Sequence, residues 1–112
     1  MYSVLFSPQS NKASWEFYGE LTDPQGVPVD LTGCTMVFAV NGKNSGRQHL
    51  VASTDNGKIT FPDTGIFRWF FERGEMGGLC AGTYETGLTI ANDTQTMQLS
   101  VGPLPITDGV VP

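Results

Sequence analysis

The chain has 112 residues, of which 39% are apolar and 15% charged, and it contains 14 glycines and 7 prolines. Its length supports one domain, and its composition is too apolar for a disordered chain and too rich in glycine and proline for a helical bundle. With 11 acidic and 6 basic residues, the net charge of −5 is opposite to that of proteins that grip phosphate backbones, which excludes nucleic acid as the main partner. No apolar run reaches the roughly 20 residues of a membrane helix, and the N-terminus lacks the basic region of a signal peptide. We therefore expect a chain that is made and kept in a cytoplasm, with export by a route that it does not encode as the alternative.

Short segments of alternating apolar and polar residues, separated by turn sequences, dominate the chain and are typical of an all-β sandwich or barrel. The predicted strands are residues 14–21, 34–40, 47–53, 58–61, 65–71, 82–91 and 94–101. The sequence therefore predicts a single all-β domain of about seven strands at residues 14–101. We expect an N-terminal arm at 1–13 and an extended C-terminal arm at 102–112.

Individual elements predict further details. Both faces of 34–40 are apolar, so we expect a central strand covered on both sides. Asn56-Gly57 is a strong hairpin signal, which predicts a turn before the strand at 58–61. Residues 72–79 have no period of two and contain three glycines, which indicates a loop or one helical turn. The clearest hairpin joins 82–91 to 94–101 through a predicted two-residue turn, Asn92-Asp93.

Two sets of side chains in that hairpin are expected to face the core. They are Tyr84, Leu88 and Ile90 from the first strand, and Met97, Leu99 and Val101 from the second. Residues 102–112 carry three prolines and no alternation, which predicts an extended arm outside the sandwich.

The most aromatic strand is 65–71, with Phe67, Trp69 and Phe71 on one face and apolar residues on the other as well. One face fills the core. The other face is either buried as well, as in an ordinary core strand, or it forms an interface, because clusters of exposed aromatic residues mark interfaces.

No group of residues predicts an active site. His49, the sole histidine, lies in a weak strand with no Cys, Asp or Glu at ligand spacing, so we expect no metal and no cofactor. Cys34 and Cys80 are interpreted as buried free thiols, with a disulfide that pins the two sheets as the alternative. Glu16 and Glu20 share a strand face and are interpreted as solvated surface acids.

The order of these features resembles immunoglobulin-like β-sandwich domains of tailed-bacteriophage structural proteins, in particular baseplate and tail-fibre attachment modules. The resemblance covers 14–101 and is carried by Asp-Leu-Thr-Gly at 30–33 leading into a strand, by Asn-Gly-Lys-Ile at 56–59, and by Gly-Thr-Tyr at 82–84. It implies a structural role and no catalytic residue.

We therefore expect a non-enzymatic virion protein, assembled in the host cytoplasm from virion proteins and copies of itself, most simply a tail, baseplate or tail-fibre attachment component. The alternatives are a head decoration or head–tail connector protein, or a carbohydrate-binding module that stacks Trp15, Trp69 or Tyr84 on sugar rings. The terminal arms are expected to dock by added-strand pairing, with frayed termini as the alternative. The predicted interface residues are Val4, Leu5, Phe6, Phe67, Trp69, Phe71, Val110 and Val111.

Overall fold

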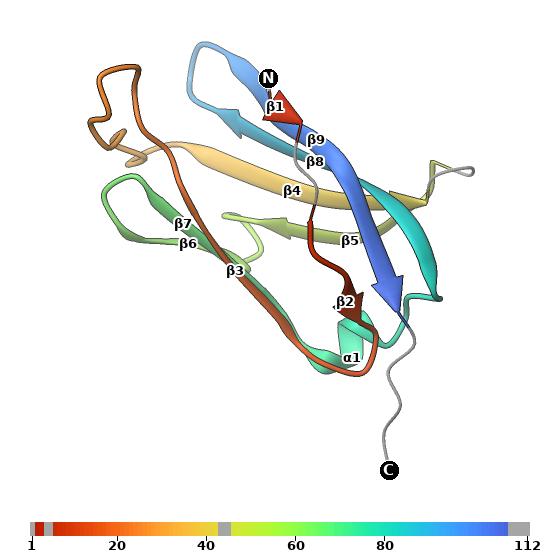
Figure 1. Ribbon diagram of the computed structural model, residues 1–112. Helices are drawn as coiled ribbons and strands as arrows, with labels where there is room; N and C mark the ends of the chain where they lie inside the picture. Colours follow the sequence, from red (N-terminus) through yellow and green to blue (C-terminus); the bar gives the residue numbers. More distant parts are fainter. Residues whose placement is uncertain (1, 4–5, 43–45, 108–112) are drawn as a thin grey trace.

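A computed structural model describes residues 2–3, 6–42 and 46–107, which form two β-sheets packed as a sandwich (Figure 1). The larger sheet has the order β1-β9-β8-β4-β5, with β2 also paired to β9, and the smaller has the order β3-β7-β6. The strands are β1 (Tyr2–Ser3), β2 (Gln9–Ser10), β3 (Trp15–Glu20), β4 (Thr35–Gly42), β5 (Gln48–Ser53), β6 (Ile59–Asp63), β7 (Ile66–Phe71), β8 (Gly82–Ala91) and β9 (Thr96–Thr107). The predicted all-β sandwich is confirmed.

The strand order is that of a variable-type immunoglobulin sandwich, in which β3, β7 and β6 correspond to strands B, E and D. In the larger sheet, β5, β4, β8 and β9 correspond to C′, C, F and G. Tyr84, near the start of β8, donates its hydroxyl hydrogen to Cys80 O and accepts from Cys80 N, both at 3.0 Å. This local bond is the tyrosine corner of the fold, and it gives the Gly-Thr-Tyr sequence at 82–84 a structural role.

Aromatic side chains fill the space between the sheets. The Phe38 ring of β4 stacks on the Trp69 ring of β7 with centroids 3.9 Å apart, and Phe17 of β3 stacks on the same indole at 4.5 Å. Trp15 adds an edge-on contact to Trp69 at 5.6 Å. Aromatic pairs of this kind add stabilisation beyond the area that they bury, so this cluster is the centre of the core.

Gly19 is required by this packing. It pairs with Phe67 across β3 and β7, and the Phe67 ring lies directly over it. A Cβ at position 19 would overlap that ring, so the glycine lets an edge strand approach an aromatic side chain closely.

The last strand is longer than predicted. β9 continues to Thr107, and Leu104 and Ile106 are 0% and 3% exposed, so residues 102–107 belong to the sandwich and the predicted start of the arm at 102 is wrong. The register shifts between Leu88 and Thr89, which pair with Ser100 and Gln98. A β-bulge of this kind turns the side chains that follow it to the other face.

The side chains of β9 that are buried differ from those predicted to face the core. Met97 and Val101 are 53% and 38% exposed, whereas Leu99 is half-buried. Val101 follows the bulge and is turned outward, where alternation alone places it inward. Met97 precedes the bulge, pairs with Ile90 and lines the same open groove as that residue, so it lies on the predicted face but is poorly covered. After the bulge the inward positions are taken by Leu104 and Ile106.

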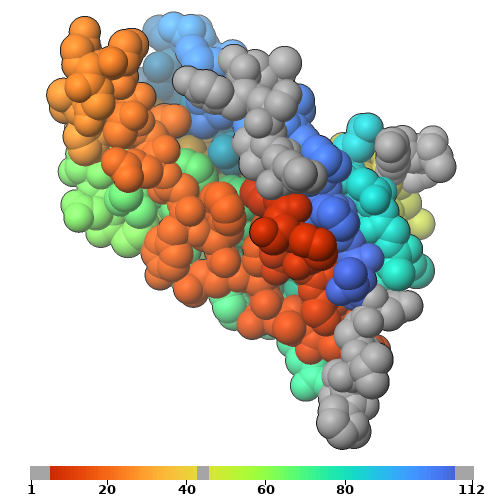
Figure 2. All heavy atoms as spheres, in the orientation of Figure 1, coloured from red at the N-terminus to blue at the C-terminus, as the bar shows by residue number. Residues whose placement is uncertain are grey.

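The N-terminal segment also joins the sandwich. β1 and β2 pair in parallel with β9, and Phe6 between them is 7% exposed and packs on the rings of Trp15 and Phe17. Figure 2 shows residues from 6 onward, in red, between β3 and β9. The described part of the predicted 1–13 arm is therefore structured, and its prediction as an arm is wrong, because Phe6 fills part of the space between the two sheets and β1 and β2 pair with β9.

The structure corrects three local predictions, which concern two connections between strands and the burial of β4. Asn56-Gly57 joins β5 to β6, which belong to different sheets, so this turn is a crossover and not a hairpin. The β8–β9 connection is a longer loop, closed by a bond of 3.0 Å from Asn92 N to Gln95 O. β4 is central but buried on its inner face only, since Val37 and Ala39 are half-buried on the outer face. The predicted helical turn is confirmed as α1 (Arg73–Met76).

Candidate interaction surface

The predicted aromatic interface lies inside the protein. Phe67, Trp69 and Phe71 are 6%, 1% and 0% exposed and form the inner face of β7. They cannot contact a neighbouring protein without opening the sandwich, so their assignment as interface residues is wrong. Trp15 and Tyr84, named with Trp69 as platforms for a sugar, are 4% and 9% exposed, which removes all three as stacking surfaces.

The terminal residues named as anchors have different outcomes. Phe6 belongs to the core, and its N–H donates to Pro103 O at 3.4 Å. Val4, Leu5, Val110 and Val111 lie outside the described residues.

The outer face of β3 and β7 instead carries a group of four side chains, which we call the Arg68 patch: Glu16, Tyr18, Arg68 and Phe70. Tyr18 is 57% exposed, whereas Arg68 and Phe70 are half-buried. The Arg68 guanidinium carbon lies 5.4 Å from the centre of the Phe70 ring and 5.9 Å from that of Tyr18. The strand register brings these residues together, because Tyr18 pairs with Arg68 and Glu16 with Phe70.

Glu16 fixes the guanidinium on this face. Arg68 Nε donates to Glu16 Oε2 at 3.0 Å, and Arg68 Nη2 contacts the same oxygen. The hydrogen bond to Glu16 is the main reason that the pKa of Arg68 is raised above its ordinary value. An arginine held between aromatic rings by a carboxylate loses little freedom on binding, and Tyr, Phe and Arg are enriched at protein interfaces.

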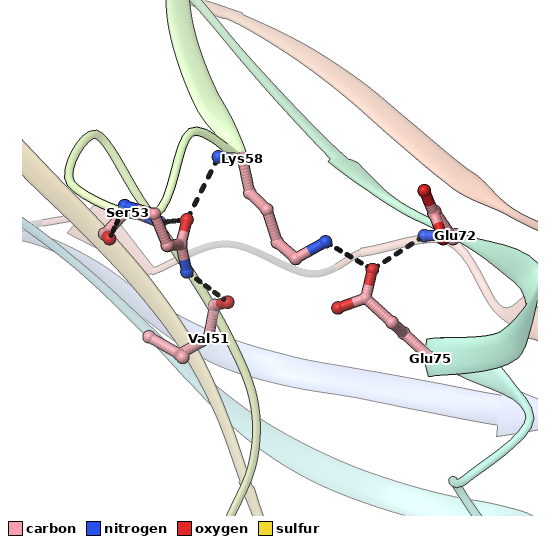
Figure 3. A network of polar contacts seen from close by, with 6 residues as sticks. Val51, Ser53, Lys58, Glu72 and Glu75 are labelled. Carbon is pink, nitrogen blue, oxygen red and sulfur yellow. Dashed lines mark hydrogen bonds and ion pairs between the residues drawn. The ribbon is translucent and has the colours of Figure 1, made fainter.

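A second polar group ties α1 to the β5–β6 turn (Figure 3). Asn56 Oδ1 accepts from Ser53 N and Lys58 N, both at 3.0 Å. Lys58 Nζ reaches across to form an ion pair with Glu75 Oε1, which also accepts from Glu72 N at 3.0 Å. These contacts hold α1 against the end of the sandwich. These contacts are structural, and they give the Glu75 carboxylate a defined role in holding α1.

Glu75 makes this group sensitive to pH. Partial burial raises the pKa of Glu75, but the Lys58 ammonium and the Glu72 N–H outweigh it, and the pKa falls below its ordinary value of 4.5. A carboxylate with a lowered pKa stabilises the fold above 4.5, and this contribution is lost as the pH falls through the lowered pKa.

We therefore expect Glu75→Gln to lower the free energy of unfolding at neutral pH by up to about 1 kcal/mol, the usual limit for a partly exposed pair. In acid the difference should shrink, because the contribution of the Glu75 carboxylate is lost as the pH falls through its lowered pKa. Urea unfolding at neutral pH and in acid measures the difference. A difference that persists undiminished in acid would show that Glu75 acts through packing and not through its charge.

The histidine and the two cysteines lie on different elements: His49 on β5, Cys34 before β4 and Cys80 before β8. His49 is exposed on β5, with its ring 5.2 Å from that of Tyr84. Cys34 and Cys80 are free thiols, half-buried and exposed respectively, so the expected burial of both is wrong and the alternative disulfide is not formed. Within residues 2–3, 6–42 and 46–107, no three His, Cys, Asp or Glu side chains lie together as metal ligands, and no helix is long and apolar enough to cross a membrane.

The strand order and the tyrosine corner are features of an immunoglobulin-like sandwich, and they define the class of fold that this chain adopts. No family model and no curated protein matches the sequence. Among solved structures, the chain is similar to the endo-β-1,4-mannanase from Thermotoga petrophila, with a TM-score of 0.55 and 13% identity. The match covers 89% of this chain and 17% of that chain. At this identity the similarity shows the fold alone.

Proposed function

We propose that this chain is a non-enzymatic structural protein of a tailed-bacteriophage virion, a tail, baseplate or tail-fibre attachment component that docks on its neighbours through the Arg68 patch. The observation that carries the proposal is the outward-facing arginine between the Tyr18 and Phe70 rings. The virion context rests on the resemblance of 30–33, 56–59 and 82–84 to phage structural domains.

The arrangement of polar side chains supports binding more than catalysis. Asp23 Oδ1 accepts from Gln25 N and Val27 N, and Asn92 Oδ1 accepts from Thr94 N and Gln95 N, all at 2.9 Å. These side chains are engaged in closing turns. The Arg68 patch, by contrast, presents an exposed ring and a fixed charge, which are the properties of residues that dominate protein–protein binding energy.

We expect Arg68→Ala to reduce incorporation of the chain into particles by at least about tenfold, the effect of a loss of about 1.4 kcal/mol in docking. The thermal midpoint should change little, because the side chain is on the surface. Arg73→Ala, which removes an exposed arginine from α1, is the matched control and should be incorporated normally.

The measurement is quantitative mass spectrometry of purified particles from phage that encode the chain, relative to a major coat or tube protein. A fixed ratio for the unmodified chain, reduced in Arg68→Ala alone, is the expected result. Absence of the unmodified chain from particles while it is abundant in the lysate would overturn the virion role. Equal loss in both variants would overturn the assignment of the docking surface.

A further inference from the structure

β3 is the edge strand of the smaller sheet and has no neighbour on its outer side among the described residues. The order of that sheet is β3-β7-β6, and the segments that precede β3 in the chain, β1 and β2, pair with β9 in the other sheet. An edge strand leaves alternate N–H and C=O groups without backbone partners, which is a template for pairing with another chain.

An apolar trough lies beside this edge, between the two sheets. A cleft of about 290 Å³ is lined by residues that include Phe17, Phe67 and Leu88, and a groove of about 520 Å³ is lined by residues that include Val29 and Ile90. Leu21 and Leu99 line both spaces, so the two are adjacent, and we call them together the edge trough. Apolar side chains of a strand that pairs with β3 would enter it, because alternate side chains of a strand point to one face.

Trp69 also lines the cleft, and the hydrogen-bonding of its indole ring bears on what could bind there. Its side chain is 1% exposed, and its indole Nε1–H is buried without a hydrogen-bond acceptor among the residues that the structure describes. Buried donors without a partner are rare in folded proteins, since water no longer satisfies them. An entering segment with a side-chain or backbone oxygen near the indole would supply the missing acceptor.

The acidic residues around the edge trough indicate which kind of peptide segment would bind there. Glu20 lines the cleft and Asp30 lines the groove, and no Lys or Arg is among the described residues that line either space. A second copy of β3 would bring Glu16 and Glu20 against an edge that already carries the same acids, and like charges across strands are unfavourable. Basic residues on the outer face of an added strand would instead lie beside Glu20.

We propose that β3 and the edge trough accept an extended segment of another protein as an added strand, with apolar residues directed into the trough and basic residues alternating with them on the outer face. Backbone pairing to β3 supplies affinity, and the trough and Glu20 supply selectivity. The inference deepens the proposed function and rests on it for the partner being a protein of the same particle. The peptide-binding test described next does not depend on the partner being a protein of the same particle.

The probe is a capped peptide of alternating lysine and valine, as long as β3. The control peptide is identical except for N-methylation along the backbone edge that would face β3, which keeps charge and composition but removes the N–H donors. We expect the unmethylated peptide to bind at least about tenfold more tightly. Resonance changes should be confined to β3, Leu21, Leu99 and the Trp69 indole N–H.

Charge reversal at two exposed acids completes the design. Glu20→Lys should weaken the unmethylated peptide by about tenfold at low salt, whereas Glu85→Lys, on β8 of the other sheet, should have a much smaller effect. Equal binding of both peptides, equal effects of both variants, or resonance changes centred on the β5 edge would each overturn the inference. The peptide experiment and the particle experiment are independent. If the chain binds the peptide but is absent from virions, the proposed function is overturned, whereas the inference of an added strand is supported.

Discussion

Phe38→Asp is expected to leave the chain unfolded under conditions in which the unmodified chain is folded. Phe38 is 0% exposed in the central strand β4, and its ring stacks on Trp69 at a centroid distance of 3.9 Å. The substitution removes this contact and places a carboxylate among the aromatic rings of Phe6, Trp15, Trp69 and Phe71. An unpaired buried charge costs several kcal/mol, and a domain of this size is stable by only about 5–15 kcal/mol in total.

Val37→Asp is the matched control, because it makes a charge of the same kind one residue away on the same strand. Val37 lies on the half-buried outer face, so water can solvate the new carboxylate. We expect this variant to remain folded with a loss of about 1–2 kcal/mol, measured by urea unfolding followed by circular dichroism. If the two variants were equally stable, the inner face of β4 would not be the centre of the core.

Alternation predicted most of the strands because a half-buried strand repeats every two residues. The predicted ranges 14–21, 65–71 and 82–91 agree with β3, β7 and β8 to within one residue at each end. It failed on β9, where one bulged residue reverses the pattern and prolines occur within the strand. It also missed β1 and β2, because two-residue strands are too short to show a period.

The interaction surface was predicted on the correct strand but on the wrong face. Both faces of residues 65–71 are apolar, so their alternation cannot show which one points inward. The deciding information is the pairing with β3, which places Tyr18 opposite Arg68. One signal was present in the sequence: Arg68 interrupts one face only, and an arginine is rarely buried unless it is paired.

A chain that stops at Val101 is expected not to fold. The truncation removes Leu104 and Ile106, which are 0% and 3% exposed, and it removes the residues of β9 that pair with β2. Each large apolar side chain lost from a core costs about 2–5 kcal/mol, and the free edge of β8 would lose its backbone partners in addition. The segment that the sequence predicts to be an arm outside the sandwich is therefore expected to be needed for the fold as far as Thr107.

A chain that stops at Thr107 is the control, because it keeps the whole of β9 and every contact described above. It should unfold at a thermal midpoint within a few degrees of the full chain, which corresponds to less than about 1 kcal/mol for a domain of this length. Leu104→Asp in the full chain separates loss of the core contact from loss of chain length, and it should unfold the protein as the Val101 truncation does. A Val101 truncation with an unchanged midpoint would instead mean that residues 102–107 dock on a sandwich that is already complete.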